Sequence, residues 1–247
     1  MFLNYVLTAW ENLRRQPAFA AIKVLSLAIG LGCSILVIMH VQYATSFDRH
    51  FANWENTYRL VTGLTTDQRL EFEGSSDAYA PQMRLDYPQI RYIANIRAGQ
   101  AFFARGGAEG SSSNSMFWAE PDIIDIFSLP FVSGDPDTAL DEPNTVVLNT
   151  STAEKYFPGE QALGQTLTMN DETALRVSGV FHDLPDNTHL DIQMLVSVAT
   201  GRQLFGEFFM GGTAWVGFGG TMTYLTLPDK QTADEISSDM TDFVTRN

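Results

Sequence analysis

The sequence predicts an α+β fold in which one N-terminal transmembrane helix is followed by a two-lobed extracytoplasmic domain. The helix is indicated by Val24 to Tyr43, twenty residues without Asp, Glu, Lys or Arg. At about 1.5 Å per residue this run spans a hydrocarbon core of roughly 30 Å. The remaining chain alternates short β-branched strands with short helices. Strand-helix-strand at the front and strand-helix at the back favour one lobe interrupted by a second, inserted at about residues 110–200.

Charge flanking the apolar run predicts its orientation. Arg14, Arg15 and Lys23 precede it, whereas Asp48 and Arg49 follow it closely. Because a Lys/Arg excess marks the cytoplasmic side, the N-terminus is expected in the cytoplasm and the domain outside. A cleaved signal peptide is the alternative, but the run is longer than such a peptide needs and ends without a small-x-small cleavage site.

Small residues recur every fourth position inside the run. Ser26, Gly30 and Ser34 form one such series, and Ala28 and Gly32 form another. Small side chains at this spacing let helix backbones approach closely, so these residues are candidates for a helix-packing face. Gly and Ser also occur in lone spans, so a single membrane anchor stays open.

The segments around the span complete the N-terminal organisation. Apolar residues at helical spacing predict an amphipathic helix over residues 1–17 on the cytoplasmic membrane surface, followed by the transmembrane helix over 18–45. Phe47, Phe51 and Trp54 predict that residues 46–56 continue the helix out of the membrane as a stalk. The domain over 46–247 begins there.

Strands and helices of the domain follow from β-branched runs, caps and prolines. Strands are expected at 57–64, 89–103, 115–120, 145–148, 166–169, 175–184, 191–198 and 223–227, with a loop tip at 105–113 and turns at 132–143. Helices are expected at 76–86, 121–127, 151–157 and 232–244, the last with Ile236, Met240 and Val244 on one face. Residues 210–227 also lack charge, but their five glycines and four threonines argue against a second span.

Composition narrows the function classes. The chain has 15 basic and 29 acidic residues, and residues 44–247 alone have 12 and 28, a net charge of −16. Such a field repels phosphate backbones, so nucleic acid is not an expected partner. The single cysteine, Cys33, lies inside the span and cannot form an intrachain disulfide.

Catalytic and metal-binding motifs are weak throughout, so we expect neither an enzyme nor a cofactor or metal site. The glycine-rich stretch 159–166 has Gln165 where a phosphate-binding loop has lysine, which favours a simple turn. His182–Asp183 and His189-x-Asp191 supply too few ligands for zinc. The acidic residues of 135–142 lack the spacing of an EF-hand.

Three stretches resemble one family. Ser46-Phe-Asp-Arg-His50 with Thr57-Tyr-Arg59, then 127–167 with Gly134-Asp-Pro136 and Ala153-Glu-Lys-Tyr-Phe157, and finally 177–197 with Gly179-Val-Phe-His-Asp-Leu184 occur in consistent order. They are similar to MacB-like, FtsX-related permease subunits of ABC transporters of the bacterial inner membrane. The resemblance implies a porter-like periplasmic core domain with an inserted lobe.

What the resemblance implies for function is mechanical. Such a permease would transmit an ATP-driven conformational change across the membrane to the outer domain, for export or extraction of peptides, lipids or lipoproteins. A separate ATP-binding cassette ATPase subunit and a permease dimer partner would be its protein partners. Family members continue into three further transmembrane helices, so this chain is expected to be a truncated form or a fragment. The rival hypothesis is a single-span anchored binding or sensor module.

Overall fold

The computed structural model describes residues 14–65, 69–72, 74–106, 112–210 and 220–246. These form two compact units, one ending at Phe47 and one beginning at Asp48. The predicted surface helix over 1–17 lies largely outside the described residues. The first unit is dominated by helix α2 (Pro17–Ala44), close to the predicted 18–45. Proline suits the first turn of a helix, where its missing N–H costs no hydrogen bond.

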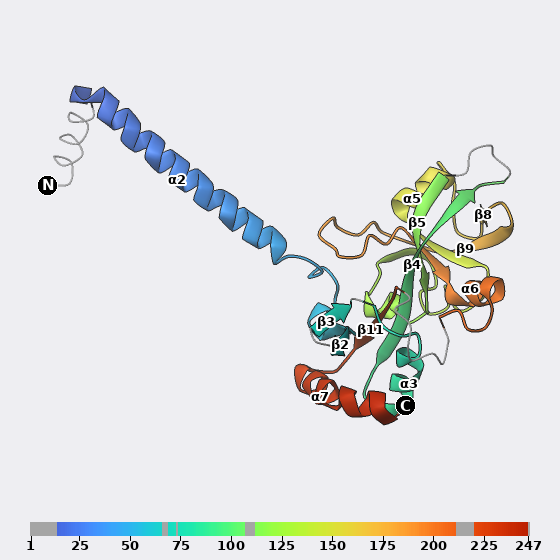
Figure 1. Cartoon of the computed structure of the whole chain (residues 1–247). Coiled ribbons are helices and arrows are strands. Elements are labelled where there is room, and N and C mark those ends of the chain that lie inside the picture. Colours follow the sequence, from blue (N-terminus) through green and yellow to red (C-terminus); the bar gives the residue numbers. More distant parts are fainter. Residues whose placement is uncertain (1–13, 66–68, 73, 107–111, 211–219, 247) are drawn as a thin grey trace. The chain divides into compact units, whose positions relative to one another are not determined.

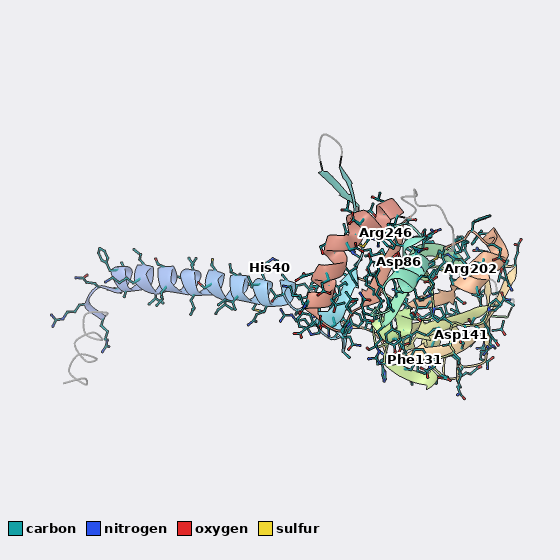
Figure 2. The ribbon with its side chains drawn as sticks, turned by 90° about the horizontal axis from the view of Figure 1, so that it is seen from below. His40, Asp86, Phe131, Asp141, Arg202 and Arg246 are labelled. Atoms are coloured by element: carbon teal, nitrogen blue, oxygen red, sulfur yellow. The ribbon has the colours of Figure 1, made fainter. Side chains whose placement is uncertain are left out.

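Helix α2 has the length and composition of a membrane span. It has 28 residues and a mean hydropathy of 2.3 over its most apolar window, and none of its residues is buried. Figure 2 shows its side chains projecting on all sides of the ribbon, with His40 toward its C-terminal end. Within the described part of the chain it is the one helix that meets this test.

The predicted helical stalk over residues 46–56 is wrong. The helix ends at Ala44, turns occupy the positions that follow, and only a short 3-10 helix, η1 (Trp54–Asn56), forms. The physical reason is the backbone of Asp48, which adopts a left-handed conformation with φ of 60°. A right-handed helix cannot pass through such a residue.

The domain after Phe47 is built on a nine-stranded mixed sheet. Its strands, in sequence order, are β1 (Thr57–Arg59), β4 (Tyr92–Ala104), β5 (Ser112–Ala119), β6 (Phe131–Gly134), β7 (Thr145–Asn149), β8 (Thr166–Met169), β9 (Thr173–Phe181), β10 (Met194–Ser197) and β11 (Thr221–Thr226). A separate hairpin pairs β2 (Thr62–Thr65) with β3 (Arg69–Phe72). Figure 2 shows this hairpin standing off the domain surface.

Most of the sheet closes into a ring. The pairing runs β4, β5, β10, β7, β9, β8 and returns to β4 through Phe103 opposite Met169. The N-terminal half of β4 pairs instead with β11, which in turn pairs with β1. Strand β4 therefore belongs to both parts, and Figure 1 shows it running from α3 and α7 at one end of the domain to α5 and β8 at the other.

Helices cover the open faces and ends of this sheet. They are α3 (Tyr79–Asp86), α4 (Ile123–Ile126), α5 (Thr150–Tyr156), α6 (Val198–Phe205) and α7 (Lys230–Arg246). The mixed α/β domain behind one apolar helix agrees with the predicted fold class. The strands from β5 to β10 fall in the range predicted for the inserted lobe, about 110–200, whose limits stay a prediction.

Side-chain alternation along the strands divides the core into three clusters. Inside the ring lie Phe103, Met116, Leu148, Leu167, Val177 and Met194, with others around them. The alternate residues of the same strands, such as Phe117, Val147 and Leu195, face a second cluster with Ile123, Phe127 and Phe51. The third cluster joins Ile93 and Leu225 to Met83 of α3 and Phe243 of α7. Period-2 alternation thus lets one sheet support three cores.

Several details differ from the sequence predictions. The strand predicted at 57–64 is two strands, β1 and β2, and β3, β6 and α6 were not predicted. On α7 the buried face includes Ile236 and Phe243, whereas Val244 is 46% exposed. The predicted face was therefore off by one residue, because the packed positions follow i, i+4 and i+7 rather than i+8.

Candidate functional site

The candidate site is the point where the chain joins the domain, which we call the junction segment (residues 48–56). Asp48 opens it four residues after the end of α2. The backbone N–H of Asp48 donates to the carbonyl of Asn187 at 3.0 Å, and its own carbonyl accepts from Phe51 at 3.3 Å. Aspartate tolerates the left-handed conformation better than most residues. The sharp turn at Asp48 thus directs its side chain to the loop between β9 and β10.

The Asp48 carboxylate is held by that loop at several points. Its Oδ1 atom accepts from the backbone N–H of His189 at 3.0 Å and from the Thr188 hydroxyl at 3.2 Å, and it lies 2.8 Å from His189 Nδ1. Both side chains are about one-third exposed, at 32% for Asp48 and 30% for His189. This clamp joins residues 141 positions apart in the sequence.

The imidazole of His189 extends the clamp to the sheet. Its Nε2 atom lies 2.7 Å from the hydroxyl of Tyr224 on β11, which is 2% exposed. The Tyr224 hydroxyl also lies 3.7 Å from the sulfur of Met222. His189 therefore connects the junction segment directly to the central sheet.

The pKa values of two groups in the junction segment are shifted. Burial raises the pKa of Asp48, but the hydrogen bonds and charge of His189, together with Thr188, outweigh it, so the pKa of Asp48 is lowered from its ordinary 3.8. The pKa of His50 is lowered from 6.5, chiefly by burial and also by the charge of His189, against the opposing effect of Asp48. The junction thus favours a charged Asp48 and a neutral His50.

An aromatic contact secures the segment beside the clamp. Phe51 is 5% exposed, and its ring centroid lies 4.9 Å from that of Phe127, which follows α4. Phe127 in turn lies 5.0 Å from Tyr224, and His50 covers Phe51 at 4.0 Å. Burial of one phenylalanine contributes about 2 to 3 kcal/mol.

After this aromatic contact the chain continues into the sheet as β1. The carbonyl of Asn56 accepts from Leu227, and β1 then pairs antiparallel with β11, with Tyr58 opposite Leu225. Arg49 lies over the ring of Trp54 at 5.1 Å, which orders the exposed part of the segment. The junction segment, which follows α2 in the sequence, is therefore held on its own domain by the polar clamp and the aromatic contact, and the three-residue strand β1 continues it onto β11.

A second polar group lies deeper, on the face of β4 between the ring cluster and the α3–α7 cluster. We call it the β4 polar cluster, formed by Ser75, Asp77, Asn95, Arg97, Thr221 and Thr223. Asn95 is fully buried, and its amide bonds the carbonyl of Asp77 and the hydroxyl of Thr223. These internally matched donors and acceptors favour a structural role.

A carboxylate at the end of β5 adjoins this cluster. Glu120 accepts from the backbone N–H of Asn95 at 2.9 Å, and its Oε1 atom lies 3.5 Å from Arg202 of α6. Burial raises the pKa of Glu120, and the nearby Arg84 and Arg202 only partly offset this. Arg202 also donates to the carbonyls of Phe209 and Met210, which ties α6 to the chain beyond it. Figure 2 places Arg202 away from the end of the domain that holds Asp86 and Arg246.

The predicted helix-packing residues all lie on α2. Ser26 and Ser34 donate to the carbonyls of Ile22 and Gly30, at 2.8 and 2.9 Å, within the helix itself. A Cβ atom added to Gly30 or Gly32 would meet nothing within 4 Å. Ala28 is exposed as well. Their role in packing against another helix stays a prediction.

The residues of the weak motifs lie in turns or make structural contacts. His182 is exposed, and the neighbouring Asp183 bonds Ser151 at the start of α5. Gly159 and Gly164 have φ of 70° and 80° between α5 and β8, which confirms the predicted turn between a helix and a strand. Within the described ranges, no group of three or more His, Cys, Asp or Glu could hold a metal ion.

The sequence alone did not reveal the clamp. The sequence pattern pairs His189 with Asp191, two residues away. The structure pairs His189 with Asp48, and Asp191 bonds Gln193 instead. Both partners lie in stretches that carry the family resemblance. Neither stretch by itself indicates which of its polar residues face the other, so this long-range pairing had no local signal.

Comparison with known proteins agrees with this architecture. The sequence profile of the MacB-like periplasmic core domain matches residues 20–243. No curated protein sequence matches the chain. Among solved structures, a domain assigned to a permease protein from Porphyromonas gingivalis is similar at 21% identity and a TM-score of 0.69, covering 80% of this chain and 84% of that one. The periplasmic region of MacB from Actinobacillus actinomycetemcomitans is similar at 16% identity and a TM-score of 0.55, covering 82% and 89%.

Proposed function

Because the chain belongs to the MacB-like periplasmic core domain family, we propose that it is the N-terminal portion of an ABC transporter permease subunit. In this role α2 spans the bacterial inner membrane with its N-terminus in the cytoplasm, and the domain after Phe47 faces the periplasm. A separate ATPase hydrolyses ATP, and a second permease copy completes the transporter. The chain transmits the resulting movement to the outer domain for export or extraction of peptides, lipids or lipoproteins.

The observation that carries the proposal is the attachment at Asp48. The junction segment follows the last residue of α2 by a few positions, so a displacement of the helix end reaches the domain through Asp48. There it meets His189 and, through it, Tyr224 on β11. A segment that is bonded to the domain at several points transmits displacement better than a flexible tether. This geometry supports a mechanical role for the chain.

A single-span anchored binding or sensor module is the competing function. Such a module would also need an anchor and an outer domain, but it would need neither an ATPase nor a tight attachment between the two. The several bonds that hold Asp48 on its own domain, so soon after the span in the sequence, support the permease over such a module.

Purification of the full chain from native membranes in mild detergent tests the proposal. We expect an ATP-binding cassette ATPase to co-purify and its ATP hydrolysis to fall severalfold when the chain carries Asp48→Ala. Asp191→Ala is the matched control, because that carboxylate bonds only within its own loop in the described contacts. A chain that purifies intact without any ATPase would support the sensor module.

Membrane orientation needs its own measurement. Thr138 lies exposed in the turn after β6, so Thr138→Cys is open to a thiol reagent. We expect an impermeant reagent to label it once the outer membrane is permeabilised, because the Lys/Arg excess precedes the span. Labelling only after cell lysis would place the domain in the cytoplasm and contradict the proposal.

A further inference from the structure

We infer that the junction segment is a releasable strap, held on the domain by two separable contacts and able to detach as one unit while the rest of the domain stays folded. The inference rests on the proposed function, since a strap between membrane helix and domain regulates how far movement is transmitted. It concerns a different property, however. That property is the opening of residues 48–56 independently of the core.

The segment has little buried apolar contact with the domain. Of residues 48–56 only Phe51 is buried, and Asp48 is held by the polar clamp on Asn187, Thr188 and His189. The next strand, β1, has three residues and pairs with β11 alone among the described strands. Regions with little buried apolar contact and exposed hydrogen bonds open at a lower free energy than the core.

The clamp is accessible to water, which makes it the releasable point. Asp48 and His189 are each about one-third exposed, so water can replace each partner when the pair separates. The groups that face the imidazole are Asp48 and His50 from the segment, Tyr224 from β11 and the ring of Phe127, which follows α4. The left-handed backbone of Asp48 can relax once the clamp opens.

The strand pairing of the sheet beneath the strap involves no residue of 48–56. Strand β11 keeps its six-residue pairing with β4, from Thr221 opposite Arg97 to Thr226 opposite Tyr92. Ile93 and Leu225 keep their cluster with α3 and α7. Detachment therefore removes Phe51 from its cluster with Phe127, whereas the strand pairing of the closed ring involves no residue of the strap.

Hydrogen exchange of the full chain in detergent, without ATPase, tests the strap. Reporter amides are those of Asp48, Phe51, His189 and Leu227, whose acceptors lie across the contact or within the strap. In Asp48→Ala we expect these amides to exchange about ten- to a hundredfold faster, because charge-assisted hydrogen bonds are lost. Amides in β7 and β9 should exchange at the wild-type rate. Asp48→Asn, which keeps the acceptor and removes the charge, should give a smaller increase.

The controls make each outcome decisive. Asp191→Ala should leave all of these rates unchanged. Equal acceleration in the strap and in β7 and β9 would mean that the segment opens only with the whole domain, and the strap would be refuted. Unchanged amide exchange at residues 48–56 in Asp48→Ala would show that the clamp does not hold the strap, and the strap would again be refuted. Because no ATPase is present, failure of this test is distinct from failure to co-purify one.

Discussion

The guanidinium of Arg97 binds the carboxylate of Asp77, with Nη2 at 2.9 and 2.8 Å from the two oxygens. Its Nε atom donates to the hydroxyl of Thr221 at 2.8 Å. The two charged side chains are 23% and 18% exposed, in the β4 polar cluster. This pair fixes the chain before α3 against the strand that both parts of the sheet share.

Removal of Arg97 should therefore destabilise the domain. Arg97→Ala leaves the Asp77 carboxylate largely buried without its cation, at an expected cost of about 2 to 3 kcal/mol in the free energy of unfolding. Arg176→Ala is the matched control, because its pair with Glu142 is exposed on both sides and should be worth less than about 0.5 kcal/mol. Chemical denaturation of the detergent-solubilised chain measures both. Equal costs would show that burial of the Arg97 pair has no energetic weight.

The packed face of α7 gives a second prediction. Phe243 is fully buried against Tyr79 and Tyr87, whereas Val244 is 46% exposed. Phe243→Ala should cost about 3 to 4 kcal/mol in the free energy of unfolding, and Val244→Ala less than about 0.5 kcal/mol. Thermal unfolding followed by circular dichroism compares the two variants. The reverse order would restore the face predicted from sequence.

The residues of α7 show which features could be predicted from the sequence and which could not. The span, most strands and four of the helices could be predicted because each leaves a local periodic signal, such as the apolar run of Val24 to Tyr43. The face of α7 was missed by one residue because Phe243 and Val244 are both apolar. Tertiary packing, not hydrophobicity, decides which of them is buried.

The candidate site could not be predicted for a different reason. Asp48 and His189 come together only because β9 and β10 carry their connecting loop to the start of the sheet. A pairing across such a distance in sequence depends on the closed ring of strands. The prediction of a helical stalk was wrong for the same reason. The left-handed conformation of Asp48 is stabilised by contacts with residues distant in the sequence, which local helical spacing does not reveal.

Alkaline pH should weaken the attachment of α7 to α3. Burial and the nearby Asp239, which accepts from the Tyr87 hydroxyl at 2.7 Å, raise the pKa of Tyr87 from 10.0 to about 12. The neutral phenol is thus favoured by folding, so its contribution is complete below pH 10 and is lost as pH rises toward 12. Tyr87→Phe cannot ionise and should show a flatter decline of unfolding midpoint across this range. Tyrosinate absorbance reports the ionisation, and identical declines would contradict the assignment.

Mild acid should weaken the junction through His50. Because burial and the charge of His189 lower the pKa of His50 below 6.5, folding favours its neutral form. Its contribution is complete above pH 6.5 and is lost as pH falls through the lowered value. His50→Gln should therefore lose less stability than the wild type between about pH 7.5 and about pH 5.5, measured by thermal unfolding. If the stability of His50→Gln fell with pH as steeply as that of the wild type, His50 would be excluded as a source of the pH dependence.

The last prediction separates a permease helix from a lone anchor. A side chain at Gly30 meets nothing in this chain within 4 Å, so Gly30→Leu has no internal clash to relieve. Leucine also favours the hydrocarbon, so insertion should be unaffected. If a second helix packs on Ser26, Gly30 and Ser34, the added bulk should cost about 1 to 3 kcal/mol at that contact. ATP hydrolysis by the co-purified ATPase should then fall, whereas Ile29→Leu, which keeps its volume on a neighbouring face, should leave it unchanged. Full activity in Gly30→Leu would mean that lipid contacts this face, as the sensor module requires.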